Sequence, residues 1–289
     1  MTEQENKPDL EEKVTSPYNS VFRLFLIPLI IVIFSVGLFY AFGFFTFENK
    51  TVEDYLYEIK AGSKAKKWQA AYSMAGLLVT EEKADPELQA LLTKQIIPLF
   101  KNKEKYELRV RSYLALALGY LKQKESVPVL IEALKGDEED IVLYSAWGLS
   151  VLGDARAQAP LIPLLKDKRP AIRKISAFAL GVFPGDSAIP GLKSVLNDSV
   201  PDVTWNAALS LSQLGDASGE DILIQLLQRS YLETFPNLAE EEKDQIMKNA
   251  ITGLVNIKAI EEHQGFIEVL SKKDSSLKVR QTAIEALKK

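Results

Sequence analysis

A repeat with a period of 31 residues runs from Glu107 to Ser230, and it limits the possible folds of this chain more than any other feature. The stretch holds four consecutive copies without an internal gap. A fixed period of this length indicates stacked supersecondary units that bury their apolar faces against one another. Five columns keep one residue type in all four copies; they are Val110/Ile141/Ile172/Val203, Ala115/Ala146/Ala177/Ala208, Leu118/Leu149/Leu180/Leu211, Leu130/Leu161/Leu192/Leu223 and Leu134/Leu165/Leu196/Leu227.

The apolar pattern within each copy of the repeat predicts two helices separated by a turn. In the first helix, apolar positions three and four apart form one stripe that faces a core. The alanine column lies beside this stripe, where a small side chain lets neighbouring helices approach closely. The second helix starts near a Gly-Asp pair in three copies, Gly153-Asp154, Gly185-Asp186 and Gly215-Asp216. Gly ends helices and Asp caps them, so we expect turn chemistry at these aspartates and no catalytic role.

The pattern extends more loosely in both directions. An irregular first pair is expected over residues 52–102, an insertion over 230–241, and final repeats over 242–289. Irregular ends are typical of the caps of a solenoid. The predicted fold class is all-α, a right-handed α-solenoid of about six helix pairs over residues 48–289. A transmembrane helix over 23–47 and a disordered polar tail over 1–22 are expected before it.

A short motif within the repeats, V-R-x-x-A/S-x-x-A-L-G, resembles the short bacterial HEAT-like repeats, the group that includes the repeats first described in phycobilisome lyases. It occurs here as Ile172-Arg173 with Ser176, Ala179, Leu180 and Gly181, and again as Val279-Arg280 with Ala283, Ala286 and Leu287. The resemblance covers about residues 52–289 and implies an armadillo-type solenoid. It implies less about function, because that family includes scaffolds, adaptors and a few enzymes. The recurring Arg111, Arg173 and Arg280 are expected to form hydrogen bonds or ion pairs between repeats.

The segment from Leu24 to Phe47 holds 24 residues without a charge. As a helix it would span ~36 Å, which exceeds the ~30 Å hydrocarbon core of a bilayer. An acidic preceding tail and the lack of a small-x-small cleavage site argue against a signal peptide. We therefore expect a retained single-pass anchor, in a bacterial inner membrane. Flanking lysines mildly favour a cytoplasmic soluble domain, but long domains cross membranes largely regardless of charge, so the side stays open.

Composition and motifs argue against several classes of function. The formal net charge of −4 argues against a nucleic-acid partner, which would need clustered Lys and Arg. The absence of Cys excludes disulfides, thiolate metal sites and a thiol nucleophile. The single histidine, His263, is expected at the surface or at a helix end, and acidic runs such as 138–140 and 240–242 at helix starts. The sequence thus predicts no catalytic residue, no cofactor, no metal site and no enzymatic activity; the resemblance brings no matching site residue.

A candidate binding face lies opposite the core stripe of the first helices. Positions two and six after the Val/Ile column point that way at ~100° per residue. They hold mainly large apolar residues: Leu116, Leu143, Trp147, Phe178, Trp205 and Leu209. The resemblance implies that this helix lines a concave groove, in which the rings would anchor a partner. The alternative is that the rings pack between helices as core.

A second candidate surface is the insertion, where Tyr231, Phe235 and Pro236 could form an exposed loop tip. A packed loop is the alternative. The preferred function is a membrane-tethered protein–protein interaction scaffold or adaptor that binds a membrane-associated protein, as an accessory of a transporter or another membrane complex. The alternatives are a HEAT-repeat enzyme, lyase-like or glycan-acting, and a nucleic-acid-binding HEAT protein.

Overall fold

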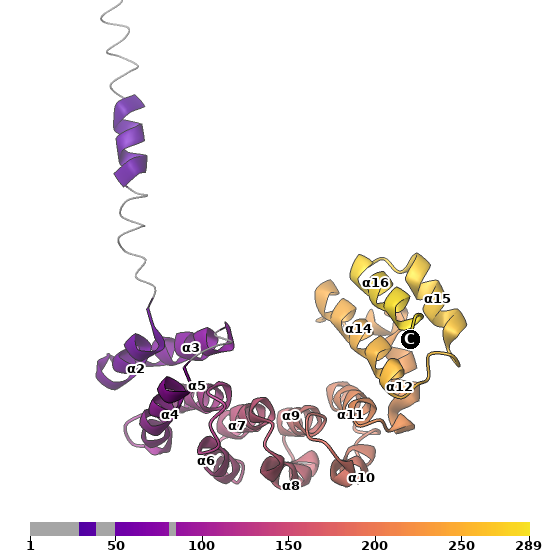
Figure 1. The fold of residues 1–289 in the computed structure, drawn as a ribbon, viewed down its shortest axis with the longest axis horizontal. Coiled ribbons are helices and arrows are strands. Elements are labelled where there is room, and N and C mark those ends of the chain that lie inside the picture. Colours follow the sequence, from indigo (N-terminus) through magenta and orange to yellow (C-terminus); the bar gives the residue numbers. More distant parts are fainter. Residues whose placement is uncertain (1–28, 39–49, 81–84) are drawn as a thin grey trace, which may run out of the picture. The chain divides into compact units, whose positions relative to one another are not determined.

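The computed structural model describes residues 29–38, 50–80 and 85–289 (Figure 1). The chain divides into two compact units, Met1–Thr51 and Val52–Lys289. Every regular element among the described residues is a helix. The predicted all-α class is therefore confirmed for this part of the chain.

Only residues 29–38 of the predicted anchor are described, and they form a helix with exposed apolar side chains, among them Ile33 and Phe34. None of the helices in the described ranges combines the length and the apolar character that crossing a membrane requires. The predicted tail over residues 1–22 lies outside the described residues. The transmembrane helix over 23–47 thus stays a prediction.

The second unit contains six pairs of successive helices and three further helices, and the range 52–102, predicted to hold one irregular pair, holds three helices. The first helices are α3 (Lys64–Thr80), α5 (Leu108–Tyr120), α7 (Glu139–Leu152), α9 (Pro170–Leu180), α11 (Pro201–Gln213) and α14 (Glu240–Asn256). The second helices are α4 (Pro86–Lys101), α6 (Ser126–Ala133), α8 (Gln158–Leu161) with the 3₁₀ turns η1 (Ala155–Ala157) and η2 (Ile162–Lys166), α10 (Ile189–Lys193) after η3 (Asp186–Ala188), α12 (Glu220–Leu226) after η4 (Ala217–Gly219), and α15 (Gln264–Lys273). Helix α2 (Val52–Ala61) precedes the pairs, α13 (Arg229–Leu232) lies in the insertion, and α16 (Leu277–Ala286) follows.

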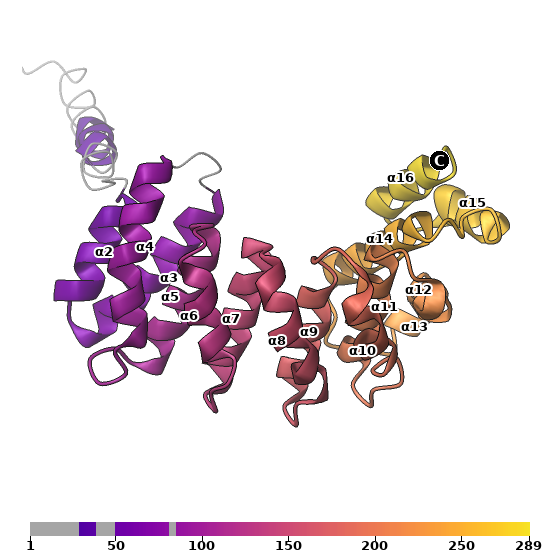
Figure 2. The same ribbon diagram turned by 60° about the horizontal axis from the view of Figure 1, so that its bottom comes forward.

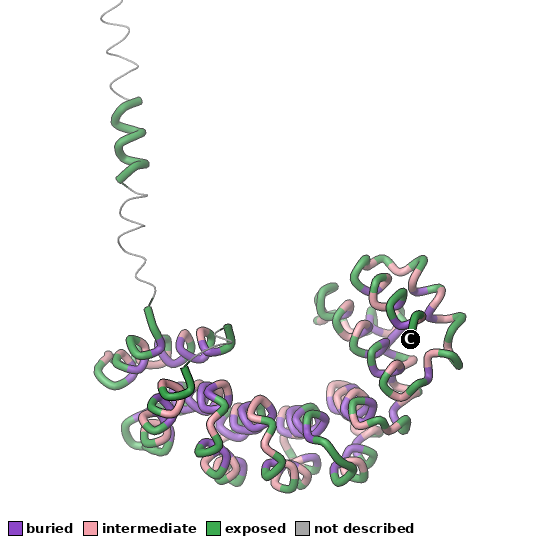
Figure 3. The backbone as a smooth tube through the Cα atoms, viewed as in Figure 1, coloured by how far each residue is buried: buried purple, intermediate pink, exposed green. Residues whose placement is uncertain are grey.

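Within residues 52–289 the helices form two rows. The first helices pack in series from α3 through α5, α7, α9, α11 and α14 to α16. Both rows follow an arc, with the first helices on its inner side (Figures 1 and 2). Buried residues concentrate between the rows (Figure 3). The alanine column lies in this layer, since Ala115, Ala146, Ala177 and Ala208 are fully buried.

The predicted turn chemistry is present in two of the three Gly-Asp pairs. Gly153 and Gly215 have φ angles of 66° and 77°, a region that favours glycine. The following carboxylates cap the next turn: Asp154 accepts from the backbone N–H of Arg156 at 3.0 Å, and Asp216 accepts from that of Ser218 at 2.9 Å. These aspartates are therefore used in capping, as the sequence predicted.

Helices α5 and α7 approach closely through two glycines. A Cβ atom added to Gly119 would lie 2.4 Å from the Cα atom of Gly148, a distance that real side chains do not reach. Backbone therefore meets backbone at this crossing. The contact fixes the separation of α5 and α7.

Candidate functional site

The residues of the predicted binding face differ in exposure in the structure. Trp147 and Phe178 are 40% and 39% exposed, and their ring centroids lie 5.9 Å apart. Trp205 is only 6% exposed and belongs to the core. The remaining predicted residues, Leu116, Leu143 and Leu209, are half-buried. The exposed part of this face is thus a pair of rings on α7 and α9.

The insertion covers Trp205. Its rings Phe235 and Tyr231 meet the indole at centroid distances of 4.9 and 6.2 Å, both edge to face. The indole Nε1–H of Trp205 donates to the Tyr231 hydroxyl at 3.3 Å. Pro236 is exposed. The alternative of packed rings is therefore the one observed for Trp205, Tyr231 and Phe235. Binding of a partner by any of the predicted residues stays a prediction.

A series of tyrosines, which the sequence analysis missed, continues the exposed rings. Tyr72, Tyr113 and Tyr144 lie on α3, α5 and α7, with neighbouring centroids 5.3 and 5.7 Å apart. Tyr144 is three residues before Trp147, so the two share a helix face. We call Tyr72, Tyr113, Tyr144, Trp147 and Phe178 the aromatic row. It spans four consecutive first helices.

The sequence contains a signal for these tyrosines, because Tyr113 and Tyr144 occupy the same position of the repeat, three residues after the Val/Ile column. Burial raises the pKa of the Tyr144 phenol, and the neighbouring Tyr113 and Asp140 raise it further. The phenol therefore stays protonated at neutral pH and can donate a hydrogen bond. At the start of the row, the Arg109 guanidinium lies 4.5 Å from the ring centroid of Trp68.

A small polar hollow lies beside the last ring of the row. It measures about 210 Å³ and is formed by α9, α11 and α14. Its lining contains no charged residue; it consists of Phe178, Asn206, Leu209, Ser210, Ser212, Gln213, Asn249, Thr252, Gly253 and Asn256. Amide side chains offer both donors and acceptors. The hollow can therefore pair with neutral polar groups such as peptide bonds.

Two of the recurring arginines form the expected contacts. Arg111 donates from Nε to the Phe100 carbonyl at 2.9 Å and from Nη1 to Glu138 at 3.0 Å. Arg173 donates from Nη1 to the backbone carbonyl of Asp167 in the preceding copy at 3.0 Å, and from Nε and Nη2 to Asp198 of its own copy at 2.7 and 2.9 Å. The predicted structural role is confirmed for both. The buried Nε of Arg280 has no hydrogen-bond partner among the described residues.

His263 is the N-cap residue of α15, as expected for a helix-end histidine. Its Nε2 lies 2.7 Å from Glu220 Oε1, a contact that connects α15 with α12. Ligand atoms of His263, Glu220 and Glu262 lie within 4.8 Å of one another, close enough to share a cation. The two acidic runs begin α7 and α14, as predicted.

Comparison with known proteins finds a relative in sequence and solved structures of similar fold. Over 101 residues the chain is 38% identical to the bilin biosynthesis protein PecE of Mastigocladus laminosus. This match covers 34% of the chain and only 37% of the relative. The complex of CpcE and CpcF of phycocyanin lyase from a Nostoc species has a similar fold, with a TM-score of 0.55 and 21% identity over 83% of this chain and 94% of the matched chain.

The prediction that the chain has no enzymatic role is wrong. Its sequence is related to a protein of bilin biosynthesis, and its fold is that of a chain in a phycocyanin lyase complex. The prediction failed because it searched for a nucleophile, an acid–base pair or a cofactor motif. A subunit that takes part in a reaction by binding and orienting the reactants leaves none of these signals.

The repeats themselves identify the fold family. The family model for HEAT repeats matches residues 93–177 and 159–234, and these ranges together include all four copies of the 31-residue repeat. Residues 93–234 of this chain are therefore HEAT repeats, and 101 residues of the chain are related in sequence to the bilin biosynthesis protein PecE.

Proposed function

We propose that this chain is the HEAT-repeat subunit of a lyase-type assembly that acts on a bilin and an acceptor protein. The sequence relationship to the bilin biosynthesis protein PecE carries this proposal. The chain has no Cys, so it cannot supply a thiol nucleophile. Its contribution would be to bind and orient the reactants.

The aromatic row is the surface best suited to that role. Trp147 and Phe178 present ring surface on which a flat conjugated ligand or an apolar side chain can pack. The uncharged hollow beside Phe178 can hydrogen-bond to a polypeptide backbone. A solenoid holds such groups in a fixed order along an extended surface.

Replacing Trp147 and Phe178 together by alanine is expected to weaken bilin binding about tenfold, because each ring contact contributes ~0.5–1.5 kcal/mol. Biliverdin is the probe, titrated into the full chain and followed by its visible absorbance. Tyr57→Ala is the matched control, since Tyr57 is a 71% exposed ring on α2 outside the row. No absorbance change with the unmodified chain, or equal weakening in the control, would speak against the proposal.

A membrane-tethered adaptor is the second candidate function. The exposed Trp147–Phe178 pair favours it, because exposed Trp residues often anchor protein interfaces. Crosslinking in native membranes distinguishes the two functions. An adaptor would lose a protein partner in the Trp147→Ala/Phe178→Ala variant while neither form binds biliverdin.

We also propose that residues 24–47 anchor the chain in a bilayer. The 24 uncharged residues and the exposed apolar helix at 29–38 support this. The full chain is expected to stay in the membrane pellet after alkaline carbonate extraction, whereas a chain that starts at residue 48 is released. Extraction of the full chain by carbonate would contradict the anchor.

A further inference from the structure

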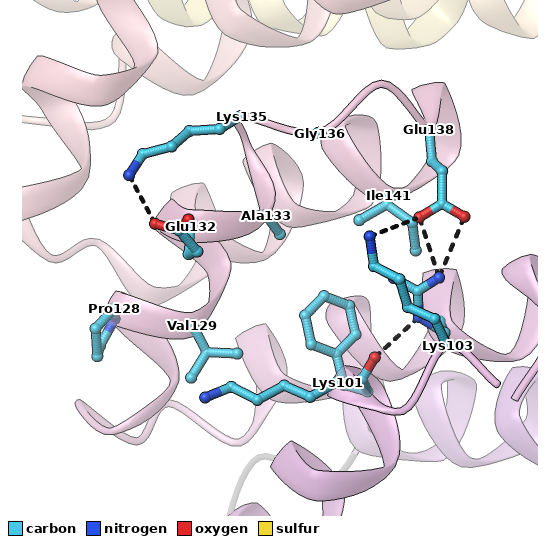
Figure 4. Close-up of a pocket in the computed structure, with 12 residues that line it drawn as sticks. Lys101, Lys103, Pro128, Val129, Glu132, Ala133, Lys135, Gly136, Glu138 and Ile141 are labelled. Carbon is cyan, nitrogen blue, oxygen red and sulfur yellow. Dashed lines mark hydrogen bonds and ion pairs between the residues drawn. The ribbon is translucent and has the colours of Figure 1, made fainter. Parts of the chain in front are cut away.

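A second cavity, unrelated to the aromatic row, lies where the end of α4, helix α6 and the start of α7 meet (Figure 4). It measures about 450 Å³, which lies within the ~300–1,000 Å³ typical of small-molecule sites. Its lining consists of Phe100, Lys101, Lys103, Arg111, Pro128, Val129, Glu132, Ala133, Lys135, Gly136, Glu138 and Ile141. No member of the aromatic row contributes to it.

The walls of this cavity are partly apolar and rigid. Phe100 and Ile141 are 4% and 3% exposed, so the core holds them in place. Val129 and Ala133, half-buried on α6, also line the cavity (Figure 4). An apolar ligand body would therefore find a preformed surface.

Some of the charged groups that line the cavity form ion pairs, and one does not. Glu138 holds Arg111, whose side chain is 5% exposed, and Lys103 lies 3.9 Å from the same carboxylate. Glu132 holds Lys135 at 2.6 Å. Lys101 has no ion-pair partner among the described residues, and it extends along the cavity beneath Val129 (Figure 4).

The lining thus carries four cationic groups and two carboxylates, in a chain whose net charge is −4. A cationic ligand would have to displace an existing ion pair, whereas an anionic one meets an unpaired ammonium.

We propose that this cavity binds an amphipathic organic carboxylate. Its apolar body packs against Phe100, Val129 and Ile141, and its carboxylate accepts a hydrogen bond from Lys101 Nζ. A monocarboxylate suits the site better than a multiply charged phosphate, because Glu132 and Glu138 already lie in the lining and would repel additional negative charge. The site is independent of the lyase-type function.

The test uses 2-naphthoate as probe, its neutral isostere 2-naphthamide as ligand control, and the full chain in detergent solution with a protein-free blank. Titration calorimetry is expected to show naphthoate binding at least tenfold tighter than naphthamide. Lys101→Gln should weaken naphthoate binding about tenfold, because a charge-assisted hydrogen bond is lost, and should leave naphthamide unchanged. Lys272→Gln, at a 70% exposed lysine on α15, is the matched control and should change neither.

A second variant tests the apolar wall. Val129→Asp places a carboxylate in the cavity and should abolish naphthoate binding, with helicity by circular dichroism unchanged. Arg111 is not substituted, because its contacts with Phe100 and Glu138 are structural. Equal affinity for the acid and the amide, or unchanged affinity in Lys101→Gln, would overturn the proposal. So would equal weakening by Lys272→Gln.

Discussion

Replacing Trp205 by alanine is expected to lower the free energy of unfolding by about 3–5 kcal/mol, the range for removing a large buried aromatic side chain. Trp205 is 6% exposed and lies at the centre of the cluster with Tyr231 and Phe235. The substitution would leave a cavity between α11 and the insertion and remove the hydrogen bond to the Tyr231 hydroxyl. Urea unfolding followed by circular dichroism measures the loss.

The matched control is Trp147→Ala, which removes the same side chain at a 40% exposed position. It is expected to cost only about 1 kcal/mol, mainly the contact with Phe178. Equal losses in the two variants would mean that Trp147 also has a structural role and would weaken its assignment to a binding surface. An unaffected Trp205→Ala variant would mean that the insertion does not depend on this cluster.

The core of the fold could be predicted from the sequence because the same pattern of apolar positions occurs in all four copies of the repeat. The alanine and leucine columns recur at the same spacing, and the stack of similar helix pairs buries them, apart from the half-buried Leu196. The second helices were less predictable. Pro160, Pro163 and Pro190 lack a backbone N–H, and the structure there consists of short helices and 3₁₀ turns.

The candidate site could be predicted only in part. Trp147 and Trp205 both follow the Val/Ile column on the face opposite the core stripe, yet one is exposed and the other buried. The difference arises from the insertion, whose rings fold back onto α11, and periodicity within a helix carries no information about such a contact. Likewise, the cavity around Lys101 is assembled from residues of four helices and depends on the tertiary fold.

Arg229 connects the insertion to two later parts of the chain. It donates to Asp274 from Nε at 2.9 Å and from Nη2 at 2.6 Å, and Nη2 also donates to Asp244 at 2.6 Å. The side chain of Asp274 is 3% exposed. Desolvation opposes ionisation of Asp244, but hydrogen bonds from Ser276 and Arg229 together hold its pKa below the ordinary value. Breaking this network would leave carboxylates without a counter-ion.

Arg229→Met is therefore expected to lower the free energy of unfolding at pH 7 by about 3 kcal/mol, the lower end of the range for breaking a buried pair, because the arginine is partly exposed. The lowered pKa of Asp244 stabilises the fold above its unfolded pKa of ~3.9 and ceases to do so as the pH falls through the folded value, so the difference from the unmodified chain should shrink in acid. Urea unfolding between pH 3 and pH 7 measures both effects.

Two further variants decide whether the cost comes from an uncompensated buried charge. Adding Asp274→Asn to Arg229→Met should restore part of the lost stability, because the double variant no longer buries a lone carboxylate at this position. Arg156→Met removes an arginine that makes the same two-pronged contact with Asp154 at a 55% exposed position, and it should leave the urea midpoint nearly unchanged. Loss of buried charge pairing does not explain the effect if Arg156→Met lowers the free energy of unfolding as much as Arg229→Met does. The same holds if the double variant is no more stable than the single one. Lost packing of the arginine side chain would then be the cause.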